Sequence, residues 1–316
     1  MSKITIIGAG DVGATIAYTL VVNGTASEIV LVDIKKEKAM GEAMDISQGT
    51  PFCPPTSIRV GDYEDAAGSD IVIITCGVAR QPGQTRLDLT HTNVGIIKEI
   101  TPQIIRYAPD AIYIMIANPV DILTYVFTKI SGLPEKQIIG SGTILDTSRL
   151  RSRLAEYLGV SQKNIHAYVF GEHGETSFVP WSLATVGSIQ MDDYLKTVAG
   201  NTKLGNLPPF DKAEIETYMR TSGSKVIAAK GATFNAISIA TCHIVRSIYG
   251  NQNAMLSVSS MMHGEYGIED VCLSTLSIVD RSGLKARITP PMTEDEITLL
   301  HRSADSLKDV IHQLSI

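Results

Sequence analysis

Short runs of consecutive apolar residues recur along the first half of the chain, and the segments between them carry apolar residues at helical spacing. Strands that are apolar throughout and alternate with helices are typical of a parallel sheet covered on both faces. This pattern therefore predicts an α/β fold with a doubly wound parallel sheet for the first half of the chain. The predicted strands cover residues 4–7, 29–32, 71–75, 112–116 and 137–140. The predicted helices cover residues 14–22, 41–49, 90–107 and 121–130.

The pattern changes near residue 145. Residues 145–158 predict a helix that leads into the second half, where more alternating strand candidates mix with long helices. We therefore predict two domains, residues 1–144 with the parallel sheet and residues 145–316 with an α+β arrangement, and a tight interface because no linker separates them. The second half is predicted to have strands at 165–170, 255–262 and 271–277, a helix at 225–249 broken only by Gly231, and an amphipathic helix at 294–314.

A glycine pattern follows the first predicted strand. Gly8, Gly10 and Gly13 are spaced as Gly-x-Gly-x-x-Gly, a helix follows, and Asp33 ends the second predicted strand. This spacing allows a tight turn, close approach of a pyrophosphate and close packing of helix on strand, with the phosphates at the positive end of the helix. Asp33 is placed to accept hydrogen bonds from ribose hydroxyls, and its charge would repel a 2′-phosphate. The segment therefore predicts a site for NAD rather than NADP.

Composition narrows the possible partners. The formal net charge of the 316 residues is −6, and the pI is near 5.7, which argues against nucleic acid as a partner. No apolar run approaches the roughly 18 residues of a membrane span, and Met1–Lys3 leads directly into the first strand without a signal peptide. The four cysteines are scattered, which fits a reducing cytoplasm, and no metal site is expected.

A histidine flanked by glycines is the first candidate for chemistry. His173 lies in a Gly-Glu-His-Gly-Glu segment after a predicted strand, so its ring has little side-chain cover and can face a cleft. Asp146 and Arg149 lie three residues apart on one face of the helix at 145–158. An aspartate bound to imidazole fixes the tautomer and stabilises the imidazolium, and an arginine clamps a carboxylate. The alternatives are a structural histidine and an ion pair on a helix surface.

A polar loop is predicted at residues 79–88. Its arginines, Arg80 and Arg86, are either solvated or belong to a mobile loop that closes over the nicotinamide, excludes water and polarises a ketone. Asn118 follows a strand, where open α/β sheets bind ligands, and is a candidate donor to the same oxygen, although Asn-Pro is also a turn signal. Thr233 is a candidate pocket residue or an ordinary helix threonine.

Together these motifs resemble one family along essentially the whole chain, the NAD-dependent L-lactate and L-malate dehydrogenases. The resemblance implies hydride transfer between NAD and a small L-2-hydroxy acid, on a Rossmann-type fold. It is carried by the glycine loop at 8–13, Thr-Arg-Leu-Asp-Leu at 85–89, Asn-Pro-Val-Asp at 118–121, Gly-Ser-Gly-Thr at 140–143, Leu-Asp-Thr-Ser-Arg at 145–149 and Gly-Glu-His-Gly-Glu at 171–175.

The resemblance also implies a role for each motif residue. His173 is then the acid/base and Asp146 its partner. Arg149 anchors the substrate carboxylate, Arg86 polarises the carbonyl, and Asn118 touches both substrate and cofactor. The implied cofactor contacts are Gly8, Gly10, Asp11, Val12, Gly13, Asp33, Thr75, Gly77, Asn118 and Ser141.

Different parts of the sequence indicate different substrates. Most of the motif text is similar to bacterial lactate dehydrogenase. Six residues before Arg86, however, lactate enzymes usually carry glutamine, whereas this chain has Arg80. Arg-x-Pro-Gly-x-Thr-Arg is similar to the malate enzymes, where that arginine pairs with the second carboxylate of oxaloacetate. Because the pocket rather than the scaffold sets discrimination, the sequence favours malate and oxaloacetate, with lactate and pyruvate as the alternative.

A remote alternative is a non-catalytic NAD-binding redox sensor. A sensor that had lost the chemistry would lack some of the four residues His173, Asp146, Arg149 and Arg86, and none is missing.

Two further residues suggest regulation. Arg151 follows Arg149 by two positions and so points away from the active site, and His166 precedes His173 by seven. In allosteric bacterial lactate dehydrogenases, an arginine and a histidine at these motif positions bind fructose 1,6-bisphosphate between subunits. The resemblance therefore implies a homotetramer whose substrate affinity rises with the bisphosphate. The alternative is a surface arginine and a partly buried histidine.

Overall fold

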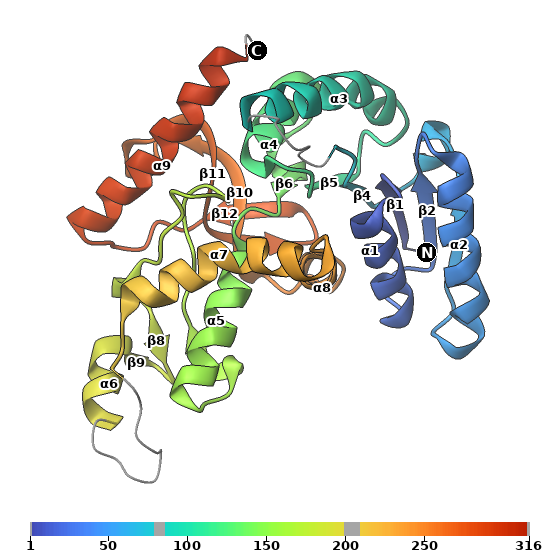
Figure 1. Cartoon of the computed structure of the whole chain (residues 1–316). Coiled ribbons are helices and arrows are strands. Elements are labelled where there is room, and N and C mark those ends of the chain that lie inside the picture. Colours follow the sequence, from blue (N-terminus) through green and yellow to red (C-terminus); the bar gives the residue numbers. More distant parts are fainter. Residues whose placement is uncertain (1, 79–85, 199–208, 315–316) are drawn as a thin grey trace.

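The computed structural model describes residues 2–78, 86–198 and 209–314, and one large sheet organises it (Figure 1). Within these residues the sheet has nine strands in the order β12-β11-β10-β6-β5-β4-β1-β2-β3. The portion from β6 to β3 is parallel and has the strand order of a Rossmann-type doubly wound sheet, which confirms the predicted fold class. Its strands are β1 (Lys3–Ile7), β2 (Glu28–Val32), β3 (Ser57–Val60), β4 (Ile71–Ile74), β5 (Ile112–Met115) and β6 (Ile138–Gly140).

The second half of the chain extends the same sheet with antiparallel strands. These are β10 (Ala254–His263), β11 (Glu269–Asp280) and β12 (Gly283–Arg287). A separate small antiparallel sheet contains β7 (Ile165–His166), β8 (Thr185–Val186) and β9 (Ile189–Gln190). The second half is therefore mixed α+β, as predicted.

Helices cover the large sheet on both faces. One apolar core joins α1 (Asp11–Val22), α2 (Lys36–Gly49) and α8 (Asn235–Tyr249) to the sheet. The other core joins α3 (Arg86–Tyr107), α4 (Val120–Ser131) and α9 (Glu294–Gln313) to the opposite face. Each core contains residues from both halves of the chain. A third core lies beside the small sheet and includes residues of α5 (Ile144–Leu158), α6 (Met191–Val198) and α7 (Lys212–Lys230).

The two halves meet where β6 lies beside β10, and we call this junction the seam. Gly140 of β6 pairs with Ser259 of β10, and Gly142 follows two residues later with a φ of 50°. A Cβ atom at Gly140 would overlap Thr124 Oγ1, and one at Gly142 would overlap Ser274 Oγ. The backbones therefore approach as closely as they do only because neither position carries a side chain.

Two predicted segments in the second half are wrong in detail. Residues 165–170 are not one strand, because β7 ends at His166 and Phe170 pairs with Phe178 outside the small sheet. The segment predicted as a helix at 225–249 with a break at Gly231 belongs to two helices, since α7 begins earlier, at Lys212, and ends at Lys230, and α8 begins at Asn235. Gly231 lies between them with a φ of 88°, a left-handed value that a continuing helix excludes.

The first half contains two further differences. β3 was not predicted, because its four residues alternate between exposed and half-buried positions rather than forming a continuous apolar run. The loop predicted at 79–88 is shorter, since α3 already begins at Arg86. The rest of that loop, including Arg80, lies outside the described residues. The domain boundary at residue 144 stays a prediction.

The glycine loop yields a prediction about stability. A Cβ at Gly13 would overlap the carbonyl oxygen of Gly8, whereas one at Gly41, in α2, would meet nothing within 4 Å. We expect Gly13→Ala to lower the free energy of unfolding by about 1–3 kcal/mol, as overpacking does. Gly41→Ala is the control and should raise it by up to about 1 kcal/mol, because alanine favours helix. Urea unfolding of both variants measures the difference; equal effects would contradict the close packing at Gly13.

Candidate active site

A buried carboxylate joins two of the predicted residues. Asp146 lies in the first turn of α5 and is only 4% exposed. One of its oxygens, Oδ2, lies 2.5 Å from His173 Nδ1, and the other, Oδ1, accepts a hydrogen bond of 2.8 Å from Arg149 Nη1. The structure thus brings together the histidine, aspartate and arginine that the sequence singled out. With Nδ1 directed at Asp146, the other ring nitrogen, Nε2, is left for a substrate.

The charges of this cluster set its protonation. The Asp146 carboxylate raises the pKa of His173 to about 9, although burial of the ring and the charge of Arg149 act in the opposite direction. Burial alone would raise the pKa of Asp146, but the charges and hydrogen bonds of His173 and Arg149 outweigh burial and hold it below its usual value. At neutral pH the unliganded site therefore contains an ionised Asp146 between two cations.

Three different elements hold the segment that carries His173. Gly171 pairs with Ser274 of β11, and the Glu172 N–H donates to Ser303 Oγ of α9 at 2.7 Å. The His173 N–H donates to Asp121 Oδ2 of α4, also at 2.7 Å. Sequence reasoning did not find these supports, because two are single serines and the third is a lone acid at the start of an apolar helix.

A cleft of about 430 Å³ opens beside His173. Its lining includes Asn118, which follows β5, and apolar residues of α9 such as Leu307 and Val310. Asn118 and His173 therefore share one cleft, as the motif reading expected. The lining does not include Thr233, which lies in the connection between α7 and α8 rather than in a helix. Arg86 is the first residue of α3.

Asn93 is a site residue that the sequence analysis missed. It is 2% exposed, its Oδ1 accepts from the Val78 N–H at 2.9 Å, and its Nδ2 donates to the Asn118 carbonyl at 2.7 Å. It therefore ties the backbone after β4 to the backbone after β5. The available signal was an asparagine on the apolar face of the predicted helix 90–107, four residues before Ile97.

The glycine loop has the features of an anion site. Gly10 caps the N-terminus of α1 without a side-chain hydrogen bond, and a Cβ there would meet nothing within 4 Å. Among the described residues there is therefore space for a ligand beside Gly10, where the first N–H groups of α1, at Asp11 and Val12, have no partner within the helix. Thr75 donates its hydroxyl to the Gly8 carbonyl at 2.9 Å and holds the loop against the end of β4. This arrangement fits a dinucleotide pyrophosphate.

The remaining predicted cofactor residues follow three strands of the parallel sheet. Asp33 follows β2, and its carboxylate accepts from the N–H groups of Ala9 at 2.6 Å and Lys35 at 2.7 Å, which fixes its orientation beside the glycine loop. Gly77 follows β4 and lies against Asn93, and Ser141 follows β6. All therefore lie at the carboxyl edge of the parallel sheet, where such folds bind ligands.

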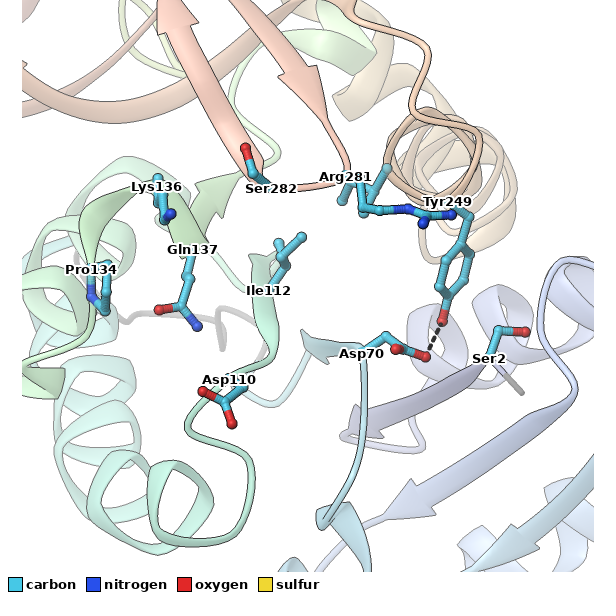
Figure 2. A pocket seen from close by; sticks show the side chains of 11 residues that line it. Ser2, Asp70, Asp110, Ile112, Pro134, Lys136, Gln137, Tyr249, Arg281 and Ser282 are labelled. Atoms are coloured by element: carbon cyan, nitrogen blue, oxygen red, sulfur yellow. Dashed lines mark hydrogen bonds between the residues drawn. The ribbon is translucent and has the colours of Figure 1, made fainter.

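A larger hollow, of about 770 Å³, lies at the opposite edge of the sheet (Figure 2). Its lining includes Asp70 and Ile112, at the amino ends of β4 and β5. Figure 2 shows the Tyr249 hydroxyl directed at Asp70, which also accepts a hydrogen bond of 2.8 Å from the Lys3 N–H. These contacts tie β1 and α8 to β4, and the hollow contains none of the predicted site residues.

The two predicted regulatory residues occupy different surroundings. Arg151 donates from Nε to the Ala167 carbonyl at 2.9 Å and lines a groove of about 410 Å³ between α5 and α8. The lining includes Lys163, His243 and Arg246 and, among the described residues, no acidic side chain. His166 is exposed on β7 and is not part of that lining.

Two other kinds of feature are absent from residues 2–78, 86–198 and 209–314. No group of three or more histidine, cysteine, aspartate or glutamate residues within them has the arrangement of a metal site. None of the helices in those ranges is long and apolar enough to cross a membrane.

Family models account for nearly the whole chain. Residues 2–140 match the lactate/malate dehydrogenase NAD-binding domain, and residues 143–315 match the lactate/malate dehydrogenase alpha/beta C-terminal domain. The chain belongs to the lactate/malate dehydrogenase family. It is an NAD-dependent L-2-hydroxy acid dehydrogenase, and the sequence-based predictions of family, fold and cofactor are confirmed.

Individual relatives of this dehydrogenase are similar over their full length. L-lactate dehydrogenase of Acetivibrio thermocellus is 44% identical over 316 residues, which is 100% of this chain and 98% of that protein. L-lactate dehydrogenase of Thermoanaerobacterium saccharolyticum is 43% identical over 316 residues and is covered completely, as is this chain. Among solved structures, a lactate dehydrogenase from a Medee basin deep-sea metagenome library has a TM-score of 0.94 at 36% identity, covering 100% of this chain and 99% of that one.

The coupling between Asp146 and His173 can be tested in the unliganded dehydrogenase. Because Asp146 is the main cause of the raised His173 pKa, Asp146→Asn should move that pKa from about 9 toward the ordinary imidazole value. The measurement is an NMR titration of the histidine resonances, with His173→Gln to assign the signal. Arg153→Gln, on the same helix but ion-paired to Glu156, is the control and should leave it in place. A titration unchanged in Asp146→Asn would contradict the assigned cause.

Proposed function

We propose that this dehydrogenase interconverts L-lactate and pyruvate. The observation that carries the proposal is a similarity along the whole chain. The two bacterial relatives described above are L-lactate dehydrogenases, and the solved structure of high TM-score is a lactate dehydrogenase. On the basis of Arg80, the sequence favoured malate and oxaloacetate as the substrates. The comparisons favour its alternative, lactate and pyruvate.

The geometry of the cluster supports the proposed roles of His173, Asp146 and Arg149, and the family resemblance supports those of the other residues. When bound, NAD supplies the nicotinamide that accepts the hydride from C2 of the hydroxy acid. Neutral His173 takes the hydroxyl proton at Nε2, and Asp146 stabilises the imidazolium that forms. Arg149 binds the carboxylate with donors that its bond to Asp146 leaves over. Arg86 polarises the carbonyl in the reverse direction, and Asn118 contacts substrate and cofactor. Thr233, which does not line the described cleft, is given no role here.

The proposed cofactor contacts lie at the carboxyl edge of the sheet. The glycine loop and the start of α1 bind the pyrophosphate, and Asp33 binds the adenosine ribose. We further propose that residues 1–144 form the NAD-binding domain and residues 145–316 the substrate domain. All four cysteines are free, which is consistent with a reducing cytoplasm as the site of action. The cofactor residues proposed are Gly8, Gly10, Asp11, Val12, Gly13, Asp33, Thr75, Gly77, Asn118 and Ser141.

A malate/oxaloacetate enzyme is the second candidate function. Arg80 favours it, because a guanidinium in a water-poor pocket requires an anion, and the second carboxylate of oxaloacetate supplies one whereas the methyl of pyruvate does not. Its side chain lies outside the described residues, so the case for malate rests on the sequence alone.

Steady-state kinetics with two keto acids separates the candidates. A lactate enzyme should have a kcat/KM for pyruvate at least about tenfold above that for oxaloacetate, and Arg80→Gln should change the ratio by less than that factor. A malate enzyme should prefer oxaloacetate, and Arg80→Gln should shift the ratio toward pyruvate by roughly 30-fold or more, since a buried charge pair loses one partner. Arg106→Gln, at the far end of α3, is the matched control. Preference of the unmodified protein for oxaloacetate would overturn the lactate proposal.

We also propose that fructose 1,6-bisphosphate regulates a homotetramer through Arg151 and His166. What supports this is the charge of the groove beside Arg151. Arg151, Lys163 and Arg246 line it without a described acidic side chain, in a protein whose net charge is −6. His243 lines it too, but burial and the two arginines lower the pKa of that imidazole and favour its neutral form. An excess of cations at one place suits a ligand with two phosphates, and a site between subunits would couple binding to assembly.

The regulatory proposal predicts a change in apparent substrate affinity. Saturating bisphosphate should lower the KM for the preferred keto acid roughly fivefold or more and stabilise the tetramer in sedimentation velocity. Arg151→Gln should abolish both effects. Arg153→Gln removes a neighbouring arginine that is already paired with Glu156 and Glu214, and should preserve them. Unchanged kinetics and sedimentation in the presence of bisphosphate would refute this proposal while leaving the lactate assignment intact.

A further inference from the structure

Asp121 is a buried acid that the proposed mechanism does not use. It lies in the first turn of α4 and is 3% exposed. Its Oδ2 accepts the 2.7 Å hydrogen bond from the His173 main-chain N–H, and its Oδ1 has no hydrogen-bond partner among the described residues. Leaving one oxygen of a buried carboxylate unpaired is unfavourable, so this arrangement has a cost that packing alone does not explain.

The surroundings of Asp121 make its charge significant. Burial raises the pKa of Asp121 to about 6, while the Ser259 hydroxyl and the His173 N–H lower it. The Ser259 hydroxyl lies close enough to Asp121 to lower its pKa, although the Ser259 oxygen has no hydrogen-bond partner among the described residues. The group is therefore ionised at neutral pH, and its negative charge lies in a poorly solvated place behind the histidine.

We propose that Asp121 is a positioning residue for His173: its carboxylate fixes the main chain of the histidine and supplies a second negative charge, besides Asp146, that favours the imidazolium. This inference rests on the proposed acid/base role of His173. The two acids act from different elements, Asp146 from α5 on the ring and Asp121 from α4 on the backbone. The position of the His173 ring is therefore fixed both by its hydrogen bond to Asp146 and by the hydrogen bond of its main chain to Asp121.

Other charged groups near His173 limit what Asp121 contributes. From α5, the Asp146 carboxylate is the largest cause of the raised His173 pKa and Arg149 opposes it; Asp121 acts in the same direction as Asp146. Glu172, next to His173, raises the pKa of Asp121, and Cys272 of β11 is a buried thiol whose pKa Asp121 raises in turn. Removing the charge of Asp121 should therefore lower the His173 pKa only in part.

A purely structural role makes different predictions. An acid in the first turn of a helix stabilises the helix through the dipole, and such a role would not require the charge to be felt by His173. Asp121→Asn separates the two roles, because the amide oxygen can still accept from the His173 N–H while the charge is lost. Asp121→Ala removes both the acceptor and the charge.

The decisive measurement is an NMR titration of His173 in the unliganded protein, which depends on neither the substrate nor turnover. In Asp121→Asn we expect the His173 pKa to fall by roughly half a unit to one unit, less than in Asp146→Asn. Asp280→Asn is the matched control: Asp280 is 8% exposed at the end of β11 and binds Ser282, so His173 should titrate as in the unmodified protein. An unchanged His173 pKa in Asp121→Asn would overturn the electrostatic part of the proposal.

Kinetics tests the anchoring part. With the keto acid that the unmodified protein prefers, Asp121→Asn should keep kcat within about tenfold at low pH, while the alkaline limb of the reduction profile moves to lower pH with the His173 pKa. Asp121→Ala should lose roughly a further tenfold or more in kcat with little change in the KM for NADH. Equal activity of the Asn and Ala variants would overturn anchoring. The choice between pyruvate and oxaloacetate affects none of these outcomes, so a failed lactate proposal would be recognised separately.

Discussion

The active site depends on one carboxylate that is removed from water and shared between two cations. Asp146 is 4% exposed, and both of its oxygens are committed, one to His173 and one to Arg149. Removing both cations would leave a buried charge uncompensated, and removing one would leave one buried carboxylate oxygen without its partner, which is costly in a site removed from water. The orientation of the histidine ring and the direction of the arginine are therefore consequences of a single requirement, that this charge be neutralised in place.

That requirement is met by side chains from distant parts of the chain because the sheet brings them together. The strand order places the ends of β1, β4 and β5 side by side, and the loops that follow carry the glycine turn, Gly77 and Asn118. The histidine segment arrives from the second half and is fixed by β11, α9 and α4. Rigid elements thus supply the precision, and the chemical groups project from the short segments between them.

Much of this arrangement could be predicted from the sequence, for physical reasons. The strands at residues 4–7, 71–75 and 112–116 are apolar on both faces because helices cover both faces, so their positions were predicted nearly to the residue. Asp146 and Arg149 were paired correctly because helix periodicity fixes which residues share a face. β3 was missed because an edge strand with alternating exposure carries little of that signal.

Other features depend on tertiary contacts that no local pattern encodes. Asn93 and Asp121 are buried polar residues within apolar segments, and their value comes from backbone groups 25 and 52 residues away in the chain. Helix α7 ends at Lys230, next to the break predicted at Gly231, but its start at Lys212 was not predicted. Local sequence patterns were therefore enough to locate the helices, strands and motifs. The residues that hold the motifs in place could be identified only from the three-dimensional structure.

The seam between β6 and β10 limits how the two halves can evolve. Gly140 and Gly142 on one side are matched to Ser259 and Ser274 on the other, with no room for a side chain at either glycine. A second half taken from a different relative would fit only if it brought equally small residues to positions 259 and 274. A boundary between two domains is a natural place for recombination. At this boundary, however, the residues on the two sides must change together.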